Sequence, residues 1–336
     1  MRIVLIYLGN RVPKYVLKNY NLIKSNFPKN EVWLVVDSEK HFDKMSKNEI
    51  LVWLTPKISS YGEDHNSYRN NFWIETRNRF FALEEFHKSF SDQSLLHIES
   101  DVIIFPEFPM NDIDNVNKSI AYPMSSPDVG IASVLYCKTV EATKFFSEYV
   151  FQEINDNPRV TDTEILGSFY KNYSDKALIL RSGPDHFEAY NHHDNGVKKS
   201  LSGEKSEINN FGIFDASTLG IHLCGTDPRN QFGISSVIDP LNHHFLNVSR
   251  CKFEVINDHI YVTSGNETRI LYSLHNHSKN IKLFDSSNLM YFKNLINRRE
   301  SGSYHRFSIN GFFLYFADYF FVLLSKIKKS FSGATQ

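Results

Sequence analysis

The chain has 336 residues and a formal net charge of −1, with 41% apolar and 22% charged residues. This length suits one large α/β domain with an appendage, and the balanced charge gives no basic field of the kind that nucleic-acid-binding proteins carry. The three cysteines stand far apart, without paired or zinc-type spacing, which fits a reducing compartment. The first apolar run is too short for a signal peptide. We therefore expect a cytoplasmic protein that does not bind nucleic acid.

The amino-terminal region alternates between strand-like and helix-like patterns. Apolar runs over residues 3–8, 32–37 and 50–54 indicate buried strands, and residues 14–27 have helical spacing. This βαβ alternation predicts a mixed, mainly parallel sheet flanked by helices, a Rossmann-like α/β fold.

Three residues stand where the first two predicted strands end. Ligands of parallel α/β sheets bind beyond the carboxyl ends of the strands. Tyr7, Gly9 and Asp37 occupy those ends, which makes them candidates for contacts with a nucleotide base and ribose. The alternative is purely structural: Gly9 belongs to a turn and Asp37 caps a loop.

A helix predicted over residues 71–90 carries two arginines. Arg77 and Arg79 are two residues apart and therefore about 200° apart around the helix, so only one of them is expected to face a site. A guanidinium is suited to bidentate contact with a phosphate or with sugar hydroxyls. The alternative is a solvated or salt-bridged helix face.

Residues 95–106 read as one buried central strand with an acidic triplet inside it. Side chains two apart on an extended chain point the same way, so Glu99 and Asp101 would project together. Buried carboxylates need a partner, and a hard divalent cation such as Mg²⁺ or Mn²⁺ takes oxygen ligands. The alternative is a strand that ends at Asp101 with both acids in solvent.

Further strands are predicted over residues 119–124 and 129–136, and a helix over 140–151. An acidic turn then enters another helix, where Thr161 or Asp162 can cap the first turn.

A second informative segment spans residues 214–230. His222 stands on a short apolar run that we interpret as a strand, Gly225 follows three residues later, and Arg229 lies in the polar turn beyond it. An imidazole can coordinate a metal, a glycine lets the backbone approach a phosphate, and an arginine neutralises it.

The acidic triplet closing a hydrophobic strand resembles the DXD motif of GT-A glycosyltransferases, with Glu99 in place of the first aspartate. The segment from His222 to Gly225 is similar to the His-X-X-Gly segment of glycosyltransferase family 8 and of related bacterial polysaccharide and lipopolysaccharide enzymes. It departs from that pattern where Thr-Asp-Pro-Arg-Asn replaces Lys-Pro-Trp. The resemblance covers residues 1–235.

This resemblance implies a GT-A fold and transfer of a sugar from a nucleoside-diphosphate-sugar donor to a glycan or glycolipid acceptor, with retention of configuration favoured. Glu99, Asp101 and His222 would hold Mn²⁺ or Mg²⁺. Asp162 would lie beside the reacting sugar, or act as the general base of an inverting enzyme. Gly225 and Arg229 would contact the diphosphate.

The pattern changes after residue 240. Strand-like runs over 252–255 and 260–262 suggest a hairpin, and another strand follows over 269–275. His275 and His277 close that strand on one side of it, and we interpret them as a structural edge or an acceptor contact. We assign residues 1–240 to the catalytic domain and 241–300 to a small β-containing appendage.

Residues 301–336 form the last predicted unit. The aromatic run 309–324 would extend about 24 Å as a helix, short of the roughly 30 Å hydrocarbon core, and Asp318 interrupts it. With the basic tail that follows, it suits an amphipathic helix on the inner face of the cytoplasmic membrane. The alternative is a helix packed on the catalytic domain or on a second chain.

Two other functions remain open. One is a sugar-phosphate nucleotidyltransferase, although residues 9–14 are poor in glycine compared with the loop that such enzymes place after the first strand. The other is a non-catalytic membrane-associated scaffold, which predicts that no nucleotide binds.

Overall fold

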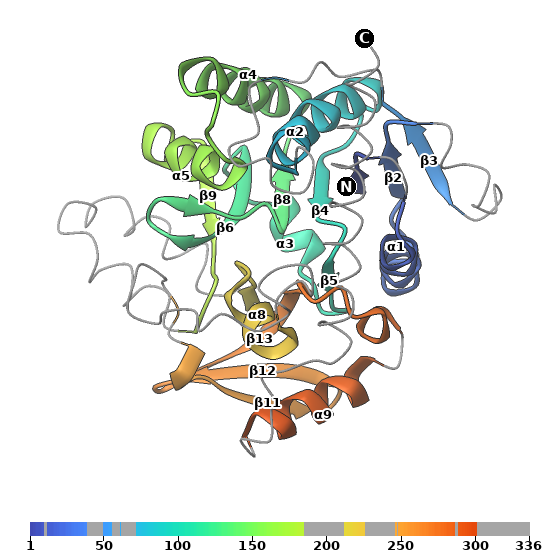
Figure 1. Cartoon of the computed structure of the whole chain (residues 1–336), viewed down its shortest axis with the longest axis vertical. Coiled ribbons are helices and arrows are strands. Elements are labelled where there is room, and N and C mark those ends of the chain that lie inside the picture. Colours follow the sequence, from blue (N-terminus) through green and yellow to red (C-terminus); the bar gives the residue numbers. More distant parts are fainter. Residues whose placement is uncertain are drawn as a thin grey trace, which may run out of the picture.

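The computed structural model describes residues 1–9, 12–38, 50–55, 61, 72–184, 212–225, 246, 248–285 and 288–300. These residues form an eight-stranded sheet covered by helices and a second, five-stranded sheet that lies below it in Figure 1.

The first sheet is mixed and mainly parallel, as predicted. Its strands in spatial order are β3 (Leu51–Leu54), β2 (Val32–Val36), β1 (Arg2–Tyr7), β4 (Leu95–Ile98), β8 (Val134–Cys137), β6 (Ile120–Ser126) and β7 (Val129–Gly130), with β9 (Ala177–Leu180) paired to β6. Strands β3, β2, β1 and β4 run parallel, β8 runs antiparallel to both β4 and β6, and β9 runs parallel to β6. The carboxyl ends of β1, β2 and β4 therefore share one edge.

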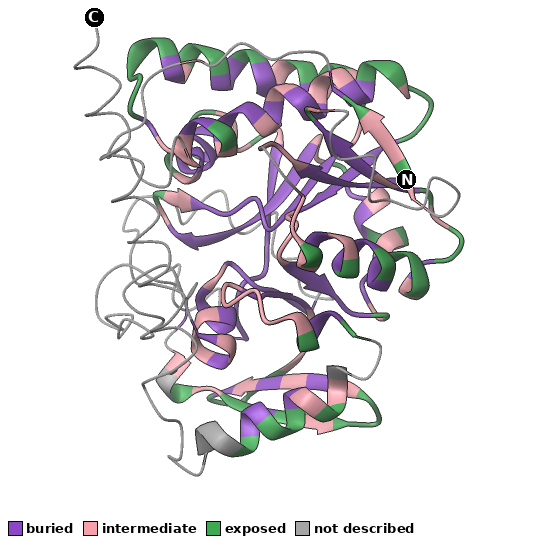
Figure 2. Ribbon diagram, turned by 45° about the vertical axis from the view of Figure 1, so that its right-hand side comes forward, coloured by how far each residue is buried: buried purple, intermediate pink, exposed green. Residues whose placement is uncertain are grey.

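Helices cover both faces of this sheet. They are α1 (Lys14–Asn26), α2 (Phe72–Ser89), α3 (Met110–Asp114), α4 (Val140–Asp156) and α5 (Asp162–Asn172). Alternate residues of β1 show why its sequence is apolar throughout: Ile3 and Leu5 pack with α1 on one face, and Val4 and Ile6 pack with α2, α4 and α5 on the other. Figure 2 shows the central strands of this sheet buried, while the edge strand β3 is partly exposed and the helices carry exposed residues on their outer sides.

The second sheet combines strands from distant parts of the chain. Its members are β10 (Ile213–Phe214), β13 (Glu267–His275), β12 (His259–Ser264) and β11 (Lys252–Ile256), with β5 (Val102–Ile104) paired antiparallel to β13. The predicted hairpin is confirmed, and its turn residues Asn257 and Asp258 both have positive φ, as a type I′ turn requires. Short elements complete this part: α8 (Thr218–Cys224), η3 (Val248–Arg250), η4 (Ile281–Phe284) and α9 (Asn288–Glu300).

Two predicted strands are wrong. The run 95–106 is broken into β4 and β5, which belong to different sheets. The segment around His222 is the helix α8 instead of a strand. Because β5 and β10 pair with the second sheet, that sheet includes strands from both sides of the predicted boundary at residue 240.

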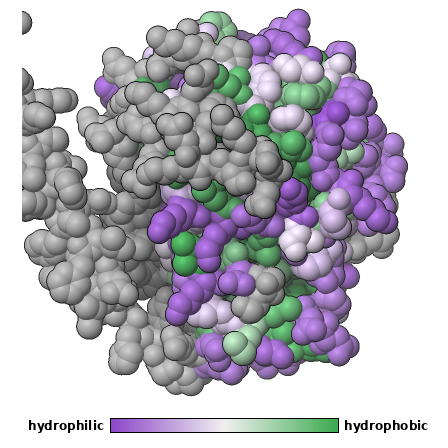
Figure 3. Space-filling model, turned by 90° about the vertical axis from the view of Figure 1, so that its right-hand side faces the viewer, coloured by the Kyte–Doolittle hydropathy of each residue, from purple (hydrophilic) through white to green (hydrophobic). Residues whose placement is uncertain are grey.

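The predicted helix 309–324 lies outside the described residues. Among the residues that are described, no helix is both long and apolar enough to cross a membrane. On the side shown in Figure 3, hydrophilic side chains cover much of the described surface, with groups of apolar side chains between them.

Candidate metal and active site

The site begins at the break between β4 and β5. The amide of Val102 donates to the carbonyl oxygen of Glu99 at 2.9 Å, closing a turn, and the amide of Glu99 donates to the carbonyl oxygen of Ser133 at 3.1 Å. Strand β4 thus leaves the first sheet at Glu99, and β5 joins the second sheet after Asp101. The acidic triplet lies where the two sheets meet.

Asn19 on α1 stabilises this break. Its side-chain amide donates to the carbonyl oxygens of Ser100 at 3.1 Å and Val102 at 2.8 Å, and the side chain is fully buried. A strand that leaves its ladder exposes backbone carbonyls, and buried carbonyls need donors. Asn19 supplies them.

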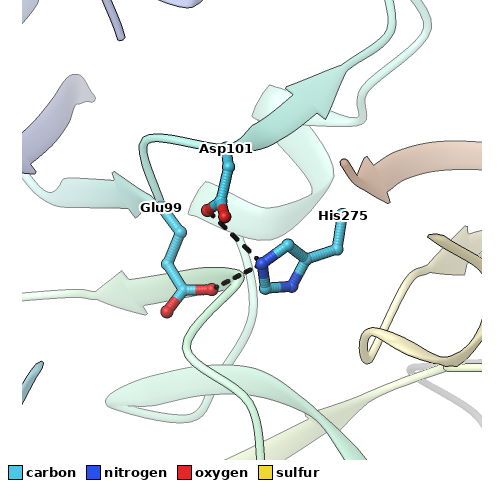
Figure 4. Close-up of side chains that lie close together, drawn as sticks. All are labelled: Glu99, Asp101 and His275. Carbon is cyan, nitrogen blue, oxygen red and sulfur yellow. Dashed lines mark ion pairs between the residues drawn. The ribbon is translucent and has the colours of Figure 1, made fainter. Parts of the chain in front are cut away.

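His275, at the end of β13, meets the two acids (Figure 4). Its Nε2 lies 3.6 Å from Glu99 Oε2 and 3.3 Å from Asp101 Oδ1, and one ligand atom from each residue lies within 4.8 Å of the others. Carboxylate oxygens with one imidazole form a donor set that Mn²⁺ or another divalent cation accepts. Glu99 Oε2 is buried and has no hydrogen-bond partner among the described residues, as expected of an atom placed to bind a ligand. These three residues fit a metal.

Cations of the protein surround the acids. Arg79 forms ion pairs with Glu99 and with Asp162, and Lys279 Nζ lies 3.1 Å from Asp101 Oδ2. Three carboxylates therefore face two permanent cations and the imidazole of His275. With His275 neutral, the cluster has one excess negative charge, which a divalent cation would more than balance.

The ion pairs decide the protonation of the acids. Burial acts to raise the pKa of Glu99, but Arg79 and His275 outweigh it and leave this pKa below its usual value. Burial opposes ionisation of Asp101 too, yet Lys279 and His275 hold its pKa well below the usual range. Both carboxylates are ionised at neutral pH, the form that binds a metal.

His275 responds in the opposite direction. Burial acts to lower its pKa, but Asp101 and Glu99 together raise it above the ordinary histidine value. A metal would therefore take the place of a proton on this ring. The ring also stacks on His277, with centroids 3.8 Å apart, which fixes its plane.

The two arginines of α2 point in different directions. Arg79 reaches the acids, whereas the fully buried Arg77 donates to the carbonyl oxygens of Pro158 at 2.7 Å, Val160 at 2.9 Å and Tyr61 at 3.1 Å. Arg77 thus ties α2 to the loop before α5, and Arg79 is the arginine that faces the site.

Asp162 is the first residue of α5. Thr161 is the N-cap and forms a capping box with Glu164, so the Asp162 side chain is not needed as a cap. It is 4% exposed, Oδ2 pairs with Arg79, and Oδ1 is buried without a hydrogen-bond partner among the described residues. Burial raises the pKa of Asp162, against the pull of Arg79.

The predicted nucleoside contacts lie at the carboxyl edge of the sheet. Tyr7 is the last residue of β1, and the amide of Gly9 donates to Asp37 Oδ2 at 3.1 Å. This bond links the loops that follow β1 and β2. Gly9 has φ of +144°, a conformation that side chains rarely adopt.

The structure does not bring His222 to the two acids. His222 lies on α8 with its ring stacked on Phe253, at a centroid distance of 5.8 Å, and it is not a member of the described group around Glu99 and Asp101. Gly225 has φ of +84° and ends α8, and Arg229 lies outside the described residues. Among the described residues, His275 is the histidine that lies beside Glu99 and Asp101.

The sequence did not indicate that His275, Lys279 and Asn19 lie around the acidic triplet. The signal for His275 was a polar residue closing an apolar strand, the same signal that identified Glu99 and Asp101. It could not be tied to them, because nothing local in the sequence indicates that β13 pairs with β5.

No protein-family model matches the chain, and no curated protein matches it by sequence. Similar solved structures include a glycosyltransferase involved in glycosylating the major capsid of PBCV-1, with 13% identity and TM-score 0.36 over 62% of this chain and 98% of that chain. Bifunctional IspDF from Campylobacter jejuni is 10% identical, with a TM-score of 0.34 over 55% of this chain and 50% of that chain. CMP:2-keto-3-deoxy-manno-octonic acid synthetase in complex with CTP is 10% identical, with a TM-score of 0.32 over 53% of this chain and 89% of that chain. These TM-scores are too low to assign a family or a reaction.

Proposed function

We propose that the chain is a metal-dependent GT-A glycosyltransferase, which transfers a sugar from a nucleoside-diphosphate-sugar donor to a glycan or glycolipid acceptor. The observation that carries this proposal is the convergence of Glu99, Asp101 and His275 beyond the carboxyl end of the central strand β4. That edge is where parallel α/β sheets bind their ligands.

The residues of the site would have separate roles. Glu99, Asp101 and His275 would hold Mn²⁺ or Mg²⁺, which when bound would neutralise charge developing on the diphosphate leaving group. Asp162 would accept a hydrogen bond from a sugar hydroxyl through Oδ1, while Arg79 keeps this carboxylate and Glu99 at a set separation.

The nucleoside would bind at the neighbouring edge of the sheet. Tyr7 offers an aromatic ring at the end of β1, and the bond between Gly9 and Asp37 orders the two loops there. A glycine at that point lets the backbone approach a ligand closely.

The test is a thermal-shift series with nucleoside diphosphates, each with and without Mn²⁺. Because a ligand that binds the folded state raises its apparent stability, we expect a shift that needs both Mn²⁺ and one particular nucleotide. Asp101→Ala should abolish it, and the exposed Asp112→Ala should retain it as a matched control. Absence of any shift in the wild type would contradict the proposal.

The product separates this reaction from nucleotidyl transfer. A glycosyltransferase releases a nucleoside diphosphate from its donor, whereas a nucleotidyltransferase releases pyrophosphate from a nucleoside triphosphate. Metal-dependent release of pyrophosphate, with none of the nucleoside diphosphate, would replace the proposed activity with that alternative.

We also propose peripheral contact with an anionic membrane through residues 306–336, which carry the aromatic run and basic tail. A glycolipid acceptor would give this contact its purpose. Deleting these residues should reduce co-sedimentation with anionic liposomes and leave Mn²⁺ binding unchanged. Equal liposome binding by the full and shortened chains would contradict the contact.

A further inference from the structure

We infer that Asp215, together with Ser133, is a positioning residue that fixes His275 against Glu99 and so sets the separation of the candidate metal ligands. The inference rests on the proposed function, because it concerns the same site. Both residues are fully buried.

Asp215 binds the backbone that carries His275. Its Oδ2 accepts from the amides of His275 at 2.9 Å and Gly220 at 2.7 Å, and Oδ1 accepts from the amide of Leu219 at 2.9 Å. Both carboxylate oxygens are thus used on backbone N–H groups. This arrangement holds the end of β13 and the start of α8 to a single carboxylate.

Ser133 connects Asp215 to the first sheet. Its hydroxyl donates to the carbonyl oxygen of Asp215 at 2.9 Å, and its own carbonyl oxygen accepts from the amide of Glu99 at 3.1 Å. A continuous path therefore leads from Glu99 through Ser133 and Asp215 to His275. The two ligands come from different sheets, and this path joins them without passing through the metal position.

Gly220 shows how closely α8 approaches His275. A Cβ at this position would lie 1.8 Å from the carbonyl oxygen of His275 and 2.8 Å from Asp215 Oδ2. The helix therefore packs directly on the backbone of the histidine, and only glycine permits that contact.

Asp215→Asn tests the inference with little change in shape. The amide group of an asparagine would face at least one backbone N–H donor, so the bonds to Leu219, Gly220 and His275 cannot all persist. Loss of a group bonded to the side chain of a metal ligand lowers metal affinity by about 10- to 100-fold, and we take the lower end of this range for Asp215, which bonds the backbone of His275. We expect a change of that size in the Kd for Mn²⁺, measured by titration calorimetry on the full chain without nucleotide.

Ser133→Ala should weaken Mn²⁺ binding less, by a few-fold, because it removes one hydrogen bond and keeps the carboxylate. Its matched control is Ser147→Ala, an equally buried serine on α4. Val262→Ala, which opens a cavity in β12, controls for lost stability alone. Both controls should retain the wild-type Kd for Mn²⁺.

The Mn²⁺ titrations distinguish failure of this inference from failure of the proposed function. If the wild type binds no Mn²⁺, the proposed function fails and this inference fails with it. If the wild type binds Mn²⁺ and Asp215→Asn binds it equally tightly, only the inference is overturned. Should Asp215→Asn not fold, the comparison of Ser133→Ala with Ser147→Ala decides in the same way.

Discussion

Arg79 links two carboxylates, the largely buried Glu99 and the buried Asp162, which approach the site from different elements. Removing the shared cation would leave both charges buried without it, and breaking a buried pair costs about 3 to 5 kcal/mol. We expect Arg79→Met to lower the free energy of unfolding by that amount, measured by urea denaturation. Mn²⁺ should restore more stability to this variant than it adds to the wild type, because it supplies the missing positive charge.

Arg77→Met is the informative control for Arg79→Met. It would leave the carbonyl oxygens that Arg77 serves without their donor, at about 1 to 3 kcal/mol for each buried group. Stability should fall here too, but Mn²⁺ should add no more than it adds to the wild type. Equal responses of the two variants to Mn²⁺ would contradict the separate roles. Replacing the exposed Arg159 by Met should change neither the free energy of unfolding nor the stability that Mn²⁺ adds.

His97 on β4 predicts a pH dependence of stability. Burial, with help from Arg79, lowers its pKa from 6.5 to about 4. The unfolded chain therefore binds this proton more readily than the folded chain, and stability is lost as pH falls from about 6.5 toward 4. At 1.36 kcal/mol per pKa unit, the loss from pH 7 to pH 5 is about 2 kcal/mol.

His97→Gln should remove that part of the pH dependence. The free energy of unfolding at pH 7 and pH 5, measured by urea denaturation for both proteins, should fall by about 2 kcal/mol more in the wild type than in the variant. The carboxylates contribute equally to the pH dependence of the wild type and of the variant. The difference between the two proteins therefore reports on His97 alone. Parallel pH profiles would show that this histidine is not kept neutral by burial.

Single residues were predictable from the sequence where their chemistry conflicts with their surroundings. Glu99 and Asp101 stand out because carboxylates interrupt an apolar run, and the 200° between Arg77 and Arg79 anticipated their different directions. Asn19 and Lys279 carry no such conflict. A polar residue on a helix or in a turn is ordinary, and its role appears only once the fold brings it to the triplet.

At the level of elements, the apolar runs predicted β1 and β2 well because both their faces are buried. Burial on both faces is also the reason why the sequence did not indicate the break between β4 and β5 at Glu99. Residues on either side of the triplet are buried, in one sheet before it and in another after it, and an apolar run reads alike in both cases. For α8 the short apolar run around His222 fits a strand or a buried helix equally well, and its length did not decide between them.

Gly167 on α5 gives a prediction in which packing opposes helix propensity. Replacing a helical glycine by alanine usually stabilises by about 0.5 to 1 kcal/mol. Here, however, a Cβ would lie 2.0 Å from the carbonyl oxygen of Asp128, which is backbone and cannot turn aside. We expect Gly167→Ala to destabilise by about 1 to 3 kcal/mol in urea denaturation. Lys171→Ala, which removes only an exposed ion pair to the same Asp128, should cost less than 1 kcal/mol by comparison. A stabilised Gly167→Ala would show that the turn between β6 and β7 moves to make room for the new side chain.

For the whole molecule, the candidate ligands come from both sheets: Glu99 follows β4, Asp101 precedes β5, and His275 ends β13. A metal bound by all three would therefore couple the stability of the two sheets. The sequence could not show this, because the coupling depends on the pairing of β5 with β13, a contact between segments far apart in the chain.

Hydrogen exchange measures that coupling. Since a ligand suppresses openings that disrupt its site, Mn²⁺ should slow amide exchange in β4 and in β13 together, while the hairpin strand β11, which contributes no ligand, changes less. Asp101→Asn should remove the protection from both strands at once, because Asp101 lies between them in the path from one sheet to the other. Protection confined to β4 would mean that the ion binds the acids without His275, and the second sheet would then have no part in the metal site.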